Sequence, residues 1–215
     1  MGLLGTGGLP LDRLRADIAF IQHELSAGQA YGMNLIANVG DPQTELRTAR
    51  LFIEMGVPAI EASAFMQITP ALVLYRAAGL VAAGDGVMSR TRILAKLSRP
   101  EVARAFMSPA PERIVQKLVA DGSLTEEQAR LLARVPMAND ICVEADSGGH
   151  TDQGVALVML SAIQRLRQEL GLAPDTVRIG LAGGIGTPEA VAAAFIMGAD
   201  FVLTGSINQC TVEAG

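Results

Sequence analysis

The chain has 215 residues, a formal net charge of −5, 50% hydrophobic residues and only 4% aromatic residues, with no tryptophan. This length is typical of about one domain, and a core of small aliphatic residues suits parallel strands covered by helices. The acidic charge and the absence of a Lys/Arg run argue against nucleic acid as a partner. Neither a signal peptide nor an apolar run of about 20 residues is seen, so we expect a cytoplasmic, soluble protein without membrane contact.

Short apolar runs alternate with segments of helical periodicity. Helix starts are indicated by Asp41-Pro42, Thr69-Pro70 and Thr187-Pro188, because proline is favoured in the first helical turn. The glycine-rich stretch 79–86 is ambiguous. In chain order, the predicted strands are 2–5, 31–37, 57–63, 92–96, 140–145, 177–182 and 201–204.

Repeated strand–helix units predict an α/β fold with a parallel sheet, either doubly wound or closed as a barrel. A complete (β/α)₈ TIM barrel usually needs about 250 residues. Here seven strands are predicted, and no full helix follows the last one. We therefore expect residues 1–215 to form a single but truncated TIM-barrel domain with strands 2–8 present and the first strand and last helix missing. A helical insertion is predicted at about 107–137.

Two glycine-bearing strand ends carry the strongest chemical signal. Ala182-Gly183-Gly184 follows strand 177–182 and precedes a helix, and Gly205-Ser206 follows the next strand. Glycines let the backbone approach a phosphate closely, and a helix N-terminus favours its negative charge. Phosphate sites in barrels form from the loops after the last two strands. A simple tight turn remains the alternative for the first segment, but together the two favour a phosphate-bearing cofactor or substrate.

A third strand end combines glycines with a histidine. Gly148, Gly149 and His150 follow strand 140–145. The glycines would let a planar ligand lie against the backbone, while the imidazole donates or accepts a proton. The alternative is a glycine turn with a surface histidine.

Two further polar residues belong to predicted strands. Lys96 ends strand 92–96, where it could stabilise a phosphate or the negative charge of a reduced cofactor, unless it is a surface lysine. Asn34 lies inside an apolar strand and needs a hydrogen bond from a ligand or from neighbouring backbone. The arginines at 90, 92, 99 and 104 form either a solvated face or a docking site for an anionic carrier arm.

The elements at 148–150 (GGH), 182–185 (AGGI) and 204–206 (TGS) resemble the flavin-dependent group that contains nitronate monooxygenases and FMN-linked enoyl reductases. Longer segments at 61–76, 95–111, 135–152 and 203–215 resemble the PfaD-type trans-acting enoyl reductases. Those proteins serve polyketide and polyunsaturated fatty acid synthases. The resemblance covers nearly the whole chain.

The resemblance implies bound FMN, NADPH as reductant and an enoyl thioester on an acyl carrier protein as substrate. Hydride would pass from NADPH through the flavin to the β-carbon, and a proton would reach the α-carbon. It implies that His150 is the catalytic proton donor, with water or another group as the alternative. The implied cofactor-binding residues are Asn34, Lys96, Gly148, Gly149, Ala182, Gly183, Gly184, Gly205 and Ser206.

Members of this family carry a strand before the segment that matches residues 2–8 and a long region after residue 215. This chain has neither, so we expect a fragment, whose own FMN binding stays open. The alternative functions are a nitronate monooxygenase, a barrel that binds a sugar phosphate, and an inactive fragment that only docks onto a synthase. A homodimer also stays open.

Overall fold

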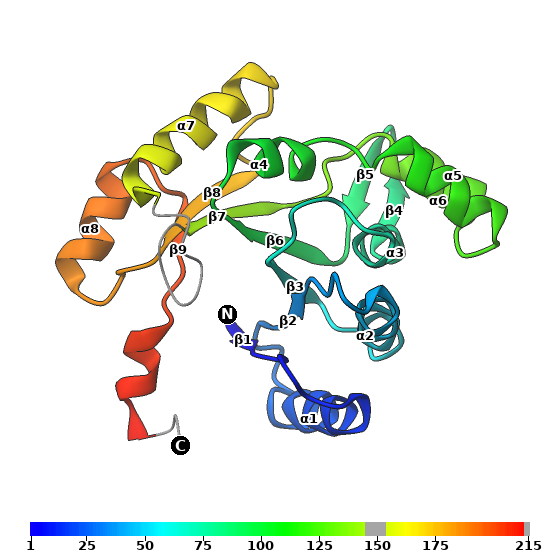
Figure 1. The fold of residues 1–215 in the computed structure, drawn as a ribbon, viewed down its shortest axis with the longest axis horizontal. Helices are drawn as coiled ribbons and strands as arrows, with labels where there is room; N and C mark the ends of the chain where they lie inside the picture. The colour runs from blue at the N-terminus through cyan, green and yellow to red at the C-terminus, as the bar shows by residue number, and fades with distance from the viewer. Residues whose placement is uncertain (145–153, 213–215) are drawn as a thin grey trace. The chain divides into compact units, whose positions relative to one another are not determined.

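The computed structural model describes residues 1–144 and 154–212, which fall into two compact units (Figure 1). Unit 1 comprises Met1–Leu94 and Ser108–Met137, and unit 2 comprises Ala95–Met107 and Ala138–Gly215. No helix in these described ranges is long and apolar enough to cross a membrane.

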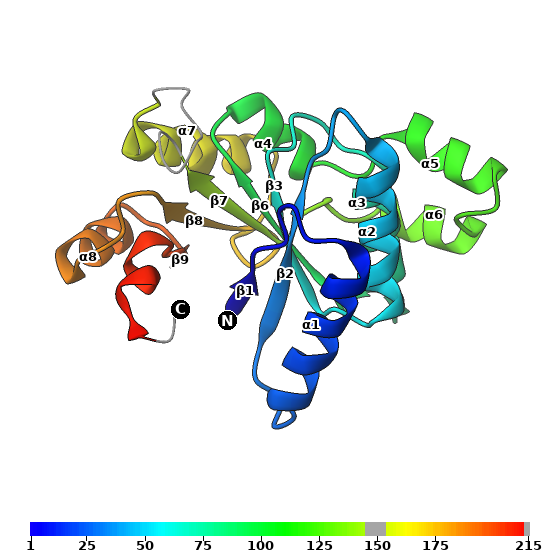
Figure 2. The same ribbon diagram turned by 60° about the horizontal axis from the view of Figure 1, so that its bottom comes forward.

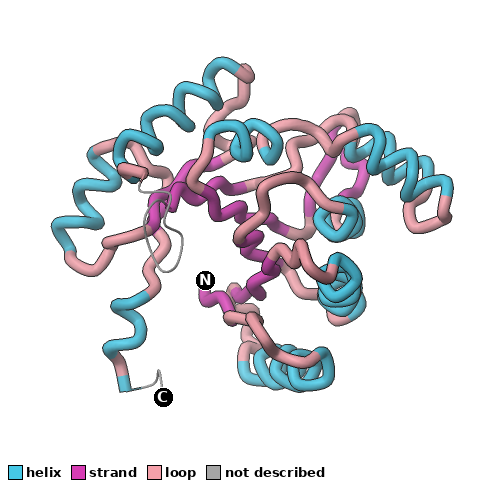
Figure 3. Tube along the Cα trace, viewed as in Figure 1, coloured by secondary structure: helices cyan, strands magenta, loops and turns pink. Residues whose placement is uncertain are grey.

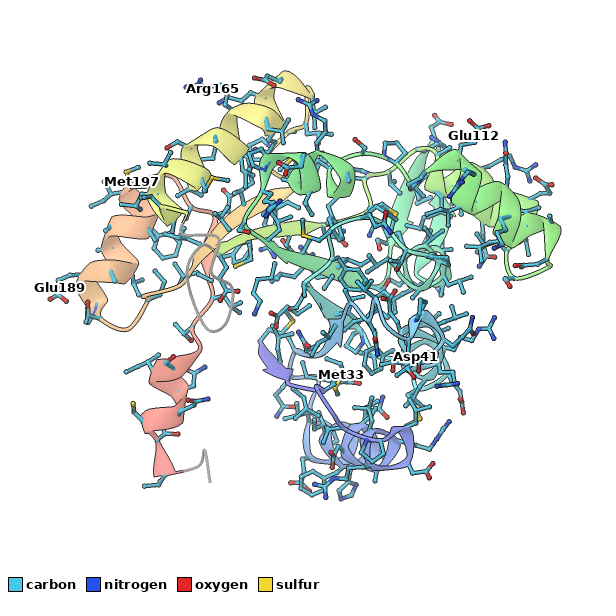
Figure 4. The ribbon with its side chains drawn as sticks, in the orientation of Figure 1. Met33, Asp41, Glu112, Arg165, Glu189 and Met197 are labelled. Carbon is cyan, nitrogen blue, oxygen red and sulfur yellow. The ribbon has the colours of Figure 1, made fainter. Side chains whose placement is uncertain are left out.

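Unit 1 is built from strand–helix repeats. Strands β1 (Gly2–Leu4), β2 (Tyr31–Ile36) and β3 (Ala59–Ser63) pair in parallel, and each is followed by a helix: α1 (Leu11–Glu24), α2 (Pro42–Glu54) and α3 (Pro70–Ala78). Successive residues of a strand point to opposite faces of the sheet, so apolar strand residues place apolar side chains on both faces. Met33 on β2 and Ile60 on β3 are both fully buried, and Figure 4 labels Met33.

The starts of α2 and α3 follow from local chemistry. The Asp41 carboxylate accepts hydrogen bonds from the backbone N–H groups of Gln43 and Thr44, both at 3.1 Å, and Figure 4 labels Asp41 at this helix end. Thr69 caps α3 by accepting from Leu72 N at 3.5 Å. Such caps satisfy backbone donors that have no partner within the helix. Both predicted helix starts are confirmed.

A hairpin and two helices complete unit 1. The stretch that is ambiguous in sequence forms antiparallel strands β4 (Leu80–Ala83) and β5 (Gly86–Ser89). Within the predicted helical stretch 107–137 lie α5 (Glu112–Ala120) and α6 (Glu126–Leu132), both coloured as helix in Figure 3. α6 begins with a capping box of Thr125 and Gln128.

Unit 2 repeats the strand–helix order. β6 (Arg92–Leu97) runs from unit 1 into unit 2, and α4 (Pro100–Phe106) follows it. Parallel strands β7 (Asp140–Glu144), β8 (Arg178–Ala182) and β9 (Phe201–Val202) follow, separated by α7 (Ala156–Glu169) and α8 (Pro188–Ile196). A 3₁₀ helix, η1 (Ser206–Cys210), comes last. Figure 2 shows α4 and α7 together beside β7.

The predicted α/β class with parallel strands is confirmed, because the neighbouring strands of β1–β3 and of β7–β9 pair in parallel. All seven predicted strands are present, although β9 is shorter than predicted and β3 begins two residues later. The predicted truncation and the single domain stay predictions.

Candidate functional site

The first glycine-bearing strand end leaves β8 in a conformation that requires glycine. Ala182 is the buried last residue of β8, and Gly183 and Gly184 follow it with φ angles of 84° and 71°. Residues other than glycine rarely adopt such positive φ values. A Cβ at Gly184 would meet nothing within 4 Å, so its backbone is open to an incoming group.

The second glycine-bearing strand end lies beside the first. β8 and β9 pair in parallel with Leu181 opposite Val202, and Leu203 N donates to Leu181 O at 3.0 Å. The loops that leave the carboxyl ends of these strands therefore start next to each other. Gly205 has φ −126°, and a Cβ there would also meet nothing within 4 Å. The structure thus brings together the two segments that the sequence singles out for phosphate binding.

The start of α8 contributes less than the sequence suggests. Thr187 accepts a hydrogen bond from Ala190 N at 3.2 Å. The exposed carboxylate of Glu189, labelled in Figure 4, has its pKa lowered by its own backbone N–H and by the Thr187 hydroxyl. These donors are engaged within the helix, and Glu189 adds a negative charge. An anion would therefore depend mainly on the glycine backbone and less on the helix end.

Lys96 lies at the end of β6 and forms an ion pair within unit 2. Its Nζ is 3.2 Å from Oε2 of Glu144, and the two side chains are 20% and 15% exposed. Glu144 is opposite Ala182 in the β7–β8 register. Lys96 is therefore not a surface lysine. Glu144 is a site residue that was not predicted from the sequence. An acidic residue at the end of an apolar strand is the sequence feature that could have indicated it.

Asn34 lies on β2 in unit 1 and belongs to a buried polar network. Its Nδ2 donates to Ser63 Oγ at 2.8 Å, and Ser63 Oγ donates to Glu61 Oε1 at 3.0 Å. Thr6 Oγ1 donates to the Asn34 backbone oxygen at 2.6 Å. The sequence leaves open whether a ligand or the neighbouring backbone satisfies Asn34, and the structure adds a third partner, the Ser63 side chain.

The remaining predicted residues divide into two sets. Gly148, Gly149 and His150 lie outside the described residues. The four arginines at 90, 92, 99 and 104 are all exposed, and two of them pair with acids at the surface, Arg99 with Glu101 and Arg104 with Glu169. This exposure favours the solvated face, and the docking of an anionic carrier stays a prediction. Residues 1–144 and 154–212 contain no cluster of three metal-ligating side chains.

Comparison with known proteins gives close relatives along the whole chain, although no family model matches. The polyketide biosynthesis protein PksE of Bacillus subtilis is 52% identical over 100% of this chain. A polyunsaturated fatty acid synthase protein of Thraustochytrium is 48% identical, also over 100% of this chain. The chain spans only 28% and 15% of the lengths of these two relatives.

Solved structures that resemble this chain include a protein of the same kind of biosynthesis as the sequence relatives. The enoyl reductase domain of MlnA, from the macrolactin biosynthesis cluster of Bacillus amyloliquefaciens, superposes with a TM-score of 0.90 at 43% identity, covering 99% of this chain and 48% of that one. FabK from Thermotoga maritima superposes with a TM-score of 0.62 at 20% identity, covering 98% of this chain and 51% of that one. The second likeness supports a shared TIM-barrel-like fold.

Proposed function

Because this chain belongs to the PfaD-type enoyl reductase family, we propose that the protein is an FMN-dependent enoyl reductase of polyketide or polyunsaturated fatty acid biosynthesis. In this proposal it uses NADPH to reduce the α,β double bond of an enoyl thioester carried by an acyl carrier protein domain. The relatives that support the proposal are synthase proteins and an enoyl reductase domain.

The observation that carries the cofactor assignment is the pair of open glycine backbones after β8 and β9. Gly183 and Gly184 hold positive φ angles, and added Cβ atoms at Gly184 and Gly205 would meet nothing within 4 Å. These residues fit a phosphate group, which is recognised by backbone N–H groups at close approach. We assign the FMN phosphate to Gly183, Gly184, Gly205 and Ser206, called here the phosphate cradle.

The other assignments follow from the family. When bound, FMN supplies the hydride transfer, and the protein positions it and adjusts the charge around it. Lys96 is placed to contribute positive charge to the end of β6, where Glu144 partly neutralises it. Asn34, Ala182, Gly148 and Gly149 are proposed cofactor contacts. His150 is proposed to deliver the proton to the α-carbon.

A visible absorption spectrum of the purified full-length protein tests the cofactor first. We expect flavin absorbance, and NADPH oxidation that accelerates when an enoyl thioester is added. A colourless protein would refute the flavin proposal in favour of a sugar-phosphate barrel. Turnover of a nitronate with oxygen, without turnover of the enoyl thioester, would instead indicate a nitronate monooxygenase.

The role of His150 is tested separately. We expect a His150→Ala variant to retain flavin absorbance and reduction by NADPH but to lose about 100-fold or more in enoyl turnover, as expected for loss of a general acid. Full enoyl turnover by this variant would remove the proton-donor assignment and leave the flavin assignment standing.

A further inference from the structure

Large hydrophobic side chains are exposed at the carboxyl ends of β2 and β3 in unit 1. Ile36 ends β2 and is 40% exposed, Val39 in the loop after β2 is 92% exposed, and Met66 in the loop after β3 is 59% exposed. A single exposed hydrophobic side chain is common on protein surfaces, whereas a group of them marks a binding site. Ile36, Val39 and Met66 are called here the apolar edge.

The two loops that carry the apolar edge are tied to each other by hydrogen bonds. Ala37 N, directly after β2, donates to Ser63 O at the end of β3 at 3.0 Å. The buried carboxylate of Glu45 accepts from Asn38 N in the first loop at 3.1 Å and from the Thr69 hydroxyl at the end of the second loop at 2.5 Å. Because one buried carboxylate holds both loops, their exposed side chains have a fixed supporting backbone.

The loop after β1 reaches the same edge of the sheet. An added Cβ at Gly7 would lie only 3.1 Å from Cδ1 of Ile36, so the backbone of this loop packs against the Ile36 side chain. Leu9, two residues further along, is another exposed hydrophobic residue, at 37%. Apolar side chains therefore occur on all three loops that leave β1, β2 and β3.

The loop that carries Met66 holds an unusual backbone conformation. Ala64, directly after β3, has a φ angle of 63°. A residue with a side chain rarely adopts such a value, and strain of this kind is concentrated at sites that bind ligands. The loop is thus shaped against its local preference, while the neighbouring Glu45 contacts hold it in place.

The position of the apolar edge indicates what it binds. In TIM-barrel folds the loops after the carboxyl ends of the strands form the substrate site. An alkyl chain makes no hydrogen bonds and is recognised by apolar side chains on a surface formed in advance. We propose that the apolar edge binds the acyl chain of the thioester substrate. This inference rests on the proposed function and goes beyond it, because it names residues that select for longer acyl chains.

Saturated thioesters of pantetheine test binding without turnover, because they have no double bond to reduce. We expect the full-length protein to bind octanoyl-pantetheine about tenfold more tightly than butyryl-pantetheine in isothermal titration calorimetry. Burial of each methylene strengthens binding about fourfold, and part of the longer chain stays in solvent. In the double variant Val39→Ser/Met66→Ser the ratio should fall to about twofold or threefold. Both side chains are mostly exposed, so these substitutions leave the core of unit 1 intact.

Met88→Ser is the matched control variant. Met88 is also in unit 1 and is 49% exposed, but it lies on β5 of the β4–β5 hairpin. It therefore removes a comparable exposed hydrophobic side chain from outside the apolar edge. This variant should keep the tenfold ratio.

The outcomes separate this inference from the proposed function. Equal affinity of the wild-type protein for the two thioesters would overturn the acyl-chain assignment, as would a tenfold ratio that survives in the double variant. Absence of enoyl thioester reduction by a protein that keeps the chain-length preference would refute the proposed function and leave the acyl-chain site standing. A wild-type dimer that the double variant converts to a monomer, with an unchanged ratio, would assign the apolar edge to a second copy of the chain and overturn the inference.

Discussion

Substitution of Gly205 by alanine is a direct test of the phosphate cradle. An added Cβ at Gly205 would meet nothing within 4 Å. Packing therefore leaves room for alanine at this position. We expect the free energy of unfolding to change by no more than about 1 kcal/mol in either direction.

The effect on FMN binding should be larger. In the proposed cradle the phosphate approaches the backbone of Gly205 closely, so an added Cβ would compete with it for the same space. The Cβ would displace the phosphate and weaken one charge-assisted hydrogen bond, which is worth about 1.5–3 kcal/mol. We therefore expect FMN affinity to fall by about tenfold to 150-fold.

The measurement is an FMN titration of Gly205→Ala together with thermal unfolding of the apoprotein. Gly86→Ala is the matched control, because Gly86 lies in the β4–β5 hairpin outside the cradle and its added Cβ would make only an ordinary contact, 3.4 Å from Ala83 O. This control should change neither property by much. Wild-type FMN affinity in a stable Gly205→Ala protein would refute the assignment of the phosphate to Gly205.

Three further predictions concern stability. Burial raises the pKa of the Tyr75 phenol above its ordinary value of 10.0, so the folded state favours the neutral phenol and the free energy of unfolding should fall as the pH rises above about 10. Absorbance at 295 nm should show that Tyr75 ionises only on unfolding, and the Tyr75→Phe variant should lack this step. Thr69→Val removes the cap of α3 and a hydroxyl that donates to the buried Glu45 at 2.5 Å, and it should cost about 1–2 kcal/mol in chemical denaturation. The Lys96→Met variant removes the Lys96 ammonium from the Glu144 carboxylate. It should lower the free energy of unfolding more than the double variant Lys96→Met/Glu144→Leu does, with a coupling energy of about 1–3 kcal/mol between the two positions. Additive effects of the two substitutions would contradict the pairing.

The strand–helix alternation could be predicted because its signals are local. Asp41-Pro42 and Thr69-Pro70 each mark a helix start through capping contacts that span no more than four residues of the chain. The apolar runs between the helices are long enough to be recognised as strands. The β4–β5 hairpin could not be predicted in this way. Its strands have four residues each, most of them exposed or only partly buried, and the turn relies on Gly84 at φ +55°. Such short strands are recognised by their pairing with each other.

The candidate site was predictable where backbone chemistry marks it. The glycines after β8 and β9 are visible as glycines in the sequence, and their proximity follows from parallel pairing of consecutive strands. The contacts of Ser63 and Glu144 were not predictable, because each involves a partner on another strand: Asn34 for Ser63 and Lys96 for Glu144. The sequence shows these residues as polar positions in apolar strands, and only the folded structure shows which partners they meet.

The structure also separates the glycines of unit 2 by what requires them. Gly180 within β8 is required by packing, because an added Cβ would lie 2.4 Å from the ring of Phe201. Gly183 and Gly184 are required by their positive φ angles. Gly205 is not required by packing, because an added Cβ there would meet nothing within 4 Å. A ligand that approaches the backbone closely would explain a glycine at that position, which is why the cradle assignment depends most on Gly205.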